Sequence, residues 1–157
     1  MRIIFVAWGR TLKFSARVTH GLRAVILLAD RYGPGSALGK EISRAESLPV
    51  AYLEQIMASL RRADLVNGTR GAGGGYVLTR DPKHVSVSEL IAALEGPLQL
   101  SDCPGGSACC GDAASCVVNE LFESAEASLI KLSDATTLAD LAERRATLIV
   151  GASMFYI

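Results

Sequence analysis

Apolar residues recur every three or four positions near the start of the chain, which is the spacing of one buried helix face. Between Phe14 and Tyr32 this face holds Val18, Leu22, Val25, Ile26 and Ala29. The run stops at Gly33-Pro34-Gly35, a combination that ends helices. The pattern predicts a buried amphipathic helix over residues 14–32.

Two shorter helices are predicted next, over residues 39–46 and from Pro49 onward, where proline suits a first helical turn. The second has an apolar stripe made of Leu53, Ile56, Met57 and Leu60. Its opposite face carries mostly polar residues: Ala51, Tyr52, Glu54, Gln55, Ser59 and Arg62. Two short helices joined by about three residues, the second with a polar face, are typical of a helix-turn-helix.

A glycine-rich hairpin follows this helix pair. Residues 65–69 and 76–79 favour strands, and between them stand Arg70, Gly71 and Gly73–Gly75. The hairpin is typical of a wing, in which glycines let the backbone approach phosphates and Arg70 reaches into a minor groove. A nucleotide-binding loop is the alternative, but the run lies between strands and lacks the Lys-Ser/Thr of a P-loop.

Three helices are predicted in the remainder. Ser86 and Glu89 have capping-box spacing, and Gly96-Pro97 ends that helix. A longer helix of some sixteen residues starts near Val117, with an apolar stripe of Val118, Leu121, Phe122, Ala125, Leu129 and Leu132. A last short helix covers residues 136–146, and we expect the apolar tail 148–157 to be buried at a dimer contact or in the core.

These elements predict a mainly α fold with a small β wing. We expect an N-terminal extension over residues 1–12, a winged helix-turn-helix DNA-binding domain over 13–97, a cysteine-rich loop over 98–116, and a dimerisation helix with its tail over 117–157. The long helix needs a surface to cover its stripe, and a second copy of the chain also matches two DNA half-sites. Folding back onto its own domain is the alternative.

Composition and charge are consistent with this organisation. Half of the residues are apolar, so we expect a globular domain, yet no apolar run approaches the ~20 residues of a membrane helix. We therefore predict a cytoplasmic protein. Residues 1–83 hold thirteen Lys or Arg against six Asp or Glu, whereas the remainder holds three against ten. This asymmetry favours a polyanionic partner for the first part, and two solvated faces are the alternative.

All four cysteines lie in "DCPGGSACCGDAASC", residues 102–116. A disulfide framework is not expected in the reducing cytoplasm, and this Gly/Ala/Ser-rich stretch offers no apolar site for buried thiols. A metal or cluster site and a thiol redox switch remain. Zinc is possible because clustered thiolates also suit its tetrahedral coordination.

The sequence gives no support for an enzyme. A thiol oxidoreductase would need C-x2-C near a βαβ unit, and neither is present. No Ser/His/Asp constellation or paired-carboxylate site occurs, and the two histidines, His20 and His84, leave few candidates for a general base. We expect His84 to be solvated in the loop after the wing.

The stretch "YLEQIMASLRRADLVNGTRGAGGGYVLTRDPKHVSVSELIAALEG" resembles the winged-helix repressor family that includes IscR and NsrR, often called the Rrf-two family. The similarity extends over residues 13–142. It implies a bacterial transcriptional regulator that binds palindromic promoter DNA as a homodimer, with the helix after the cysteine loop as the dimer interface.

The resemblance also implies DNA contacts. It assigns base reading to Ala51, Tyr52, Glu54 and Gln55, with Arg70 in the wing beside Gly73 and Gly74. Gln55 can pair with adenine and Glu54 can accept from cytosine. Ala51 stands where relatives have a hydroxyl, so the operator sequence is expected to differ. We expect Lys40, Arg61 and Arg62 to contact phosphates.

Finally, the resemblance implies an iron–sulfur cluster, [2Fe-2S] or [4Fe-4S], held by three cysteines spaced C-x5-C-x5-C. Cys103, Cys109 and Cys116 match this spacing with a slip of one residue, and Cys110 is an alternate or a fourth thiolate. Some relatives place a histidine where this chain has Asn119, whereas others use a carboxylate at the position of Thr19. His20, beside Thr19, is a candidate fourth ligand, although a histidine on an apolar helix is more often packed.

The function implied is a repressor that senses iron–sulfur, redox or nitric oxide status. In this hypothesis, assembly of the cluster orders the loop and sets the separation of two recognition helices. A zinc or thiol-switch site, or response to a metabolite without a cluster, is the alternative.

Overall fold

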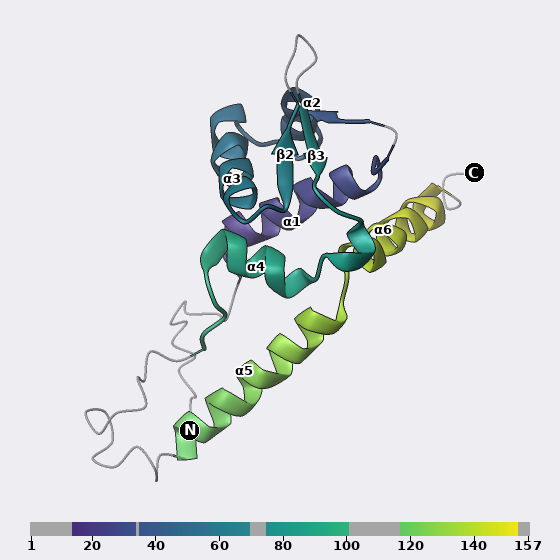
Figure 1. Cartoon of the computed structure of the whole chain (residues 1–157). Coiled ribbons are helices and arrows are strands. Elements are labelled where there is room, and N and C mark those ends of the chain that lie inside the picture. Colours follow the sequence, from purple (N-terminus) through teal and green to yellow (C-terminus); the bar gives the residue numbers. More distant parts are fainter. Residues whose placement is uncertain (1–13, 34, 70–74, 101–116, 154–157) are drawn as a thin grey trace, which may run out of the picture.

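The computed structural model describes residues 14–33, 35–69, 75–100 and 117–153. The elements run α1 (Ala16–Ala29), β1 (Ala37–Leu38), α2 (Gly39–Ala45), α3 (Val50–Arg62), β2 (Val66–Gly68), β3 (Gly75–Leu78), the 3-10 turn η1 (Pro82–His84), α4 (Val87–Glu95), α5 (Val117–Ala135) and α6 (Leu138–Ser153). Helices α1, α3 and α4 surround the core beside a small sheet, and α5 extends away from it (Figure 1). This is the predicted mainly α fold with a small β wing.

The core forms where the apolar stripes of the first helices meet. The four stripe residues of α3 are at most 1% exposed, as the sequence predicts. Val18 and Val25 of α1, and Leu90 of α4, are fully buried in the same cluster. Gly21 lets α1 and α4 approach closely, because a Cβ there would lie 2.4 Å from a methyl group of Leu94.

The sheet has three antiparallel strands in the order β1-β3-β2. The sequence predicts β2 and β3 but not β1, which has only two residues and no detectable alternation. Leu38 pairs with Gly75 across β1 and β3. A Cβ at Gly75 would lie 2.5 Å from the carbonyl oxygen of Ala37, so the pairing requires glycine at this position.

Side-chain caps and a glycine define the ends of two of the helices, and those of α4 are the ones that the sequence predicts. Ser15 caps α1 by accepting a hydrogen bond from the backbone N–H of Val18. Ser86 and Glu89 form the predicted capping box at the start of α4, each accepting from the other's backbone N–H. Gly96 ends the helix with φ +96°, a conformation that favours glycine. Helix α4 therefore ends at a defined residue, immediately before Pro97.

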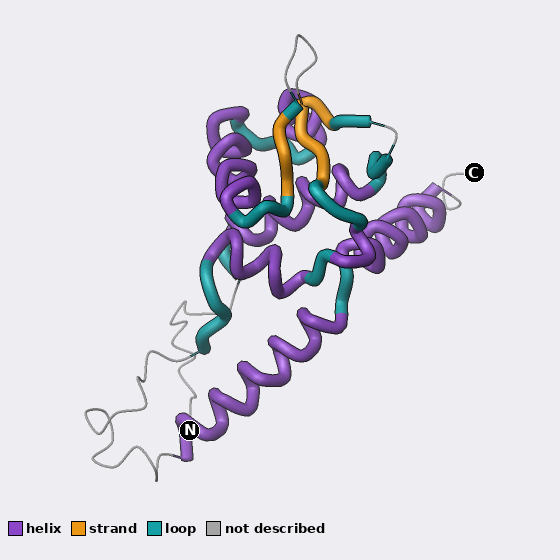
Figure 2. The backbone as a smooth tube through the Cα atoms, in the orientation of Figure 1, coloured by secondary structure: helices purple, strands orange, loops and turns teal. Residues whose placement is uncertain are grey.

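Helices α4 and α5 form the two arms of a V (Figures 1 and 2). The arms meet at the start of α4 and the end of α5, where the backbone N–H of Val87 donates to Thr136 (2.9 Å) and that of Leu138 donates to Val85 (2.8 Å). The other ends, Glu95 of α4 and Val117 of α5, are joined by the segment that carries the cysteines. The V is thus fixed at one end by the backbone.

Both C-terminal helices are longer than predicted. Helix α5 has 19 residues rather than some sixteen, and α6 continues for 16 residues into the expected tail. The described start of this tail does not pack in the core, because Leu148, Ile149 and Val150 are more than half exposed in the single chain, and its burial at a dimer contact stays a prediction. A Gly-rich or polar stop signal is absent before Gly151, so the helix simply propagates. Within the described ranges, no helix is both long and apolar enough to cross a membrane.

Candidate nucleic-acid interface

The outward face of α3 has three parts, which follow from 3.6 residues per turn. Its middle is a stripe of exposed side chains, Ala51, Gln55 and Arg62, opposite the buried stripe. Lys40, at the start of α2, is also exposed. All of these residues are among the DNA contacts that the sequence predicts, and they are accessible to a partner.

One flank of α3 faces the hairpin. Glu54 and Arg61 are exposed on this side, and a Cβ at Gly68 of β2 would lie 3.5 Å from a guanidinium nitrogen of Arg61. Burial raises the pKa of Tyr76 on β3, the negative charge of Glu54 raises it further, and Arg61 opposes both. The predicted base reader Glu54 and phosphate contact Arg61 therefore stand beside the root of the wing.

The other flank of α3 faces α1. The ring of Tyr52 meets the ring of His20 edge-on, with centroids 5.8 Å apart. One heptad further on, the hydroxyl of Ser59 accepts hydrogen bonds from Arg17 of α1 and from Arg62. Ser59 is only 3% exposed, so its expected place on the outward face is wrong. Helix α1 passes close enough there to bury this flank.

Ion pairs divide the arginines of the described ranges into two groups. Four of them have a carboxylate within salt-bridge distance: Arg23 with Glu46, Arg31 with Glu41, Arg80 with Glu89, and Arg145 with Asp30. Among the residues the structure describes, Arg17, Arg44, Arg61, Arg62 and Arg144 have none. Arg17, Arg61 and Arg62 of this group lie on α3 or against it, so positive charge without an ion-pair partner surrounds the recognition helix.

The hairpin is closed at its base by Thr69 and Gly75. The backbone N–H of Thr69 donates to Gly75 (2.9 Å), and the N–H of Gly75 donates to the hydroxyl of Thr69 (2.8 Å). The predicted wing contacts Arg70, Gly73 and Gly74 lie outside the described residues. The described base orients the hairpin alongside α3 (Figure 1).

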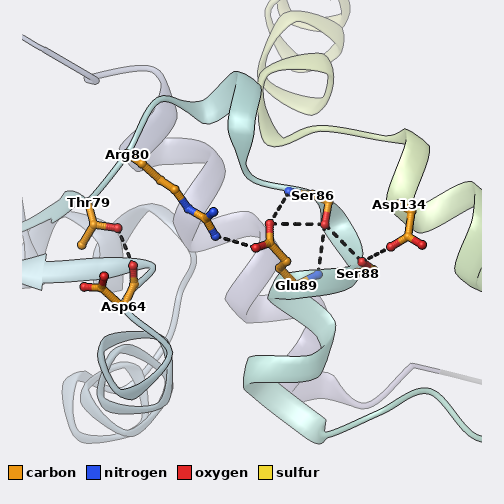
Figure 3. A network of polar contacts seen from close by, with 7 residues as sticks. All are labelled: Asp64, Thr79, Arg80, Ser86, Ser88, Glu89 and Asp134. Carbon is orange, nitrogen blue, oxygen red and sulfur yellow. Dashed lines mark hydrogen bonds and ion pairs between the residues drawn. The ribbon is translucent and has the colours of Figure 1, made fainter.

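A polar network connects the end of the wing to α4 and α5 (Figure 3). Arg80, just after β3, donates to Glu89 of α4 at 2.6 Å, and Ser88 of α4 donates to Asp134 of α5. Burial alone would raise the pKa of Glu89, but the backbone N–H of Ser86 and the guanidinium of Arg80 outweigh it and hold this pKa below its usual value. Side-chain hydrogen bonds thus connect the residue after the wing to α4, and α4 to the end of α5.

The predicted thiol ligands Cys103, Cys109, Cys110 and Cys116 lie outside the described residues. Within the described ranges, no three His, Cys, Asp or Glu side chains gather at one metal-binding position. The donor chemistry of the four cysteines would fit a metal, because soft thiolates suit iron–sulfur clusters and zinc. His20, the other predicted ligand, packs on Tyr52 with its Nδ1 buried and without a hydrogen bond in the described structure.

Comparison with known proteins decides the family. The family model for Rrf2, described as iron-dependent transcriptional regulator, matches residues 14–144. The chain belongs to the Rrf2 family. An rrf2-like HTH-type transcriptional regulator of Rhodobacter capsulatus is 35% identical over 133 residues, which cover 80% of this chain and 89% of that protein.

Solved structures of Rrf2 proteins have the same fold. IscR of T. potens matches with a TM-score of 0.70 and 34% identity, over 85% of this chain and 88% of that one. CymR, the global cysteine regulator of Bacillus subtilis, matches with a TM-score of 0.69 and 34% identity, over 85% and 98%. Rrf2 proteins are DNA-binding transcriptional regulators and not enzymes, so the winged helix-turn-helix and the exclusion of an enzyme are confirmed.

Sequence reasoning missed one member of this surface. Arg17 has an unremarkable place in the sequence, on a helix predicted to be buried. Its contact with Ser59 depends on how α1 crosses α3, which no local pattern encodes. An isolated arginine in the first turn of a buried helix is the one signal that could have drawn attention to it.

Proposed function

We propose that this chain is a cytoplasmic repressor that binds palindromic promoter DNA as a homodimer, and that its cysteine segment senses iron–sulfur, redox or nitric oxide status. The observation that carries the DNA-binding part is the outward face of α3. It combines exposed hydrogen-bonding side chains at its centre with arginines that have no acidic partner in the described structure.

We assign base reading to Gln55 and Glu54. Both are exposed on the first two turns of α3, and an amide can pair with adenine while a carboxylate can accept from cytosine in the major groove. Ala51 offers a methyl group, which suits contact with a thymine methyl. Lys40, Arg61 and Arg62, with Arg70 in the wing, position the domain on phosphates.

The homodimer is supported by α5. Three of the six residues of its predicted stripe, Val118, Leu121 and Leu132, are 60% or more exposed in the single chain. Leucine and valine at helical spacing on a projecting helix are costly in water, and a second α5 related by a two-fold axis would cover both stripes at once. Two recognition helices then face two half-sites.

We propose that Cys103, Cys109 and Cys116 hold an iron–sulfur cluster, with Cys110 as an alternate ligand. When bound, the cluster would link the three cysteines through their thiolates, and oxidants, nitric oxide or iron scarcity could remove this link. The similarity to IscR of T. potens supports this assignment, whereas the similarity to the cysteine regulator CymR favours the alternative of metabolite response. A zinc site or thiol switch would use the same cysteines.

The V of α4 and α5 offers a way for the state of the cysteine segment to affect DNA binding. Backbone hydrogen bonds at Val87 and Leu138 fix the closed end, and the segment between Leu100 and Val117 joins the open end. The backbone N–H of Leu100 donates to Glu126 of α5 (3.1 Å) across this opening. Shortening or lengthening the span from Leu100 to Val117 would change the angle between the arms, and with it the separation of two winged domains carried on paired α5 helices.

Selection from a random duplex library tests the DNA-binding part. We expect an enriched palindrome with half-sites one helical turn, or a multiple, apart. Gln55→Ala should weaken the preference for the correct base by about 1–3 kcal/mol at one position of each half-site, and it should leave the preferences at the other positions unchanged. A uniform loss for all sequences would show that Gln55 does not read bases, and failure to enrich any sequence would contradict the proposal.

Anaerobic purification with a visible spectrum and analysis of iron, sulfide and zinc tests the sensing part. Brown protein that contains iron and sulfide, and loses both in Cys103→Ala, is the expected result. Colourless protein with zinc, or with nothing bound after reconstitution, would assign the cysteines to a structural or thiol-switch role and leave DNA binding intact.

A further inference from the structure

We infer that Arg17 and Arg62 together bind one backbone phosphate of the DNA, on the edge of α3 that lies away from the wing. This inference rests on the proposed DNA-binding function and adds a contact from α1 to it. The two guanidinium groups belong to residues 45 positions apart in sequence, on α1 and α3, and they converge on the hydroxyl oxygen of Ser59.

The geometry of this pair is unusual for two cations. Arg62 donates to the oxygen of Ser59 at 2.8 Å, and Arg17 donates to the same oxygen. Ser59 is almost fully buried, which fixes the position of the oxygen. Two like charges are therefore held within a few ångströms of each other, and such a pair is unfavourable unless an anion lies nearby.

The chain supplies no such anion within the described ranges. The four carboxylates that form ion pairs are taken by other arginines, and neither Arg17 nor Arg62 has a carboxylate within 4 Å. The Nε of Arg17 is buried and makes no hydrogen bond in the described structure. One neutral hydroxyl is thus the sole described partner of the Arg17 guanidinium, which leaves the remaining N–H donors of its two Nη atoms for a ligand.

The place of the pair points to a phosphate. A helix of about 10–12 Å diameter fills a major groove of about 12 Å width, so a sugar–phosphate backbone runs along each of its flanks. One flank of α3 faces the hairpin, through Glu54 and Arg61. The other flank faces α1, through Tyr52 and Ser59. Arg17 lies at this second flank, and the side chain of Arg62 extends from the middle stripe to the hydroxyl of Ser59, so this guanidinium pair can engage phosphate oxygens with several donors.

Binding to a duplex of random sequence tests this inference, because nonspecific binding depends on phosphate contacts and requires no operator. The probe is a fluorescent duplex of about 30 base pairs, and anisotropy is measured with the full-length chain from about 0.05 to 0.2 M salt. Arg17→Gln should weaken binding roughly three- to ten-fold and make the slope of log K against log salt shallower by about one. Arg62→Gln should have the same effect, and the double variant should lose little more than either single variant.

Arg145→Gln is the matched control. It removes the same charge from α6, where the side chain of Arg145 is already ion-paired with Asp30 at the end of α1. It should leave the salt slope unchanged. Circular dichroism and thermal unfolding check that each variant is folded, and Arg17→Lys, which keeps the charge with less change of packing, should retain the wild-type slope.

The outcomes separate the two proposals. If the wild-type chain does not bind duplex DNA, the proposed function is wrong. If the wild type binds and Arg17→Gln keeps its affinity and slope, the phosphate contact is wrong while the function stands. Losses that add fully in the double variant would show two separate phosphates and overturn the shared contact.

Discussion

The ring of His20 on α1 stands perpendicular to the ring of Tyr52 on α3, with an interplanar angle of 89° and centroids 5.8 Å apart. Edge-to-face pairs of this kind stabilise by roughly 0.5–1.5 kcal/mol beyond the burial of their area. The contact joins the first helix to the first turn of the recognition helix. It also assigns His20 a structural role, which competes with its candidacy as a cluster ligand.

Substitution of His20 distinguishes these two roles. His20→Phe preserves an aromatic edge against Tyr52, so we expect DNA binding, thermal stability and any visible absorption of the anaerobically purified protein to be retained. His20→Ala should lower the free energy of unfolding by about 1 kcal/mol. Loss of absorption and iron in His20→Phe, with stability unchanged, would instead identify His20 as a ligand across the dimer.

We expect Gly75 to be far more sensitive to substitution than Gly35. A Cβ at this position would meet the backbone of Ala37 at 2.5 Å, and a backbone atom cannot move aside as a side chain can. We expect Gly75→Ala to separate β1 from β3 and to lower the free energy of unfolding by about 2–3 kcal/mol in urea titrations. Gly35→Ala is the control, because no atom lies within 4 Å of its added Cβ. Equal effects of the two substitutions would contradict the assigned pairing.

The capping box of α4 should make stability depend on pH. The pKa of Glu89 is held below its usual value, so its contribution to stability is fully present above the pKa of the unfolded chain and is lost as the pH falls through the lower pKa of the folded state. Glu89→Gln should lower the free energy of unfolding at neutral pH by about 1 kcal/mol, since its contacts are partly exposed.

The difference between wild type and Glu89→Gln should then shrink progressively as the pH falls below 4.5. Thermal unfolding across this range measures it. Glu95→Gln, at the exposed end of the same helix, should show no such convergence. A difference that stays constant with pH would mean that the carboxylate charge of Glu89 does not support the cap.

The sequence predicts those features that depend on local periodicity and end signals. The buried stripe of α3 and the Ser86–Glu89 box are read correctly because each involves residues three or four positions apart. Strand β1 is missed because its two residues are defined by pairing with β3, nearly forty residues away. The length of α6 is underestimated because its apolar end resembles a tail that needs burial.

Ser59 shows why the candidate site is only partly predictable. Helical periodicity places it on the polar side of α3, and by periodicity alone it would be solvent-exposed. The crossing of α1 buries it and brings Arg17 to its hydroxyl. The predicted base readers Glu54 and Gln55 and the predicted phosphate contact Lys40 needed no such information, because their side chains are exposed. Contacts between helices distant in sequence are thus what the sequence leaves undetermined.

The exposed stripe of α5 predicts an assembly that one charge can break. Leu121 is 65% exposed in the single chain, and burying a leucine stabilises by about 2 kcal/mol. A two-fold interface contains the residue twice, so Leu121→Glu should raise the dimer dissociation constant by about a thousand-fold, which corresponds to roughly 4 kcal/mol. Sedimentation velocity over a range of concentrations measures this change. Ala127→Glu adds the same charge to an exposed position away from the stripe and should leave the dimer intact. If Leu121→Glu and the wild type sediment alike, α5 is not the interface, and its stripe must be covered by another part of the chain.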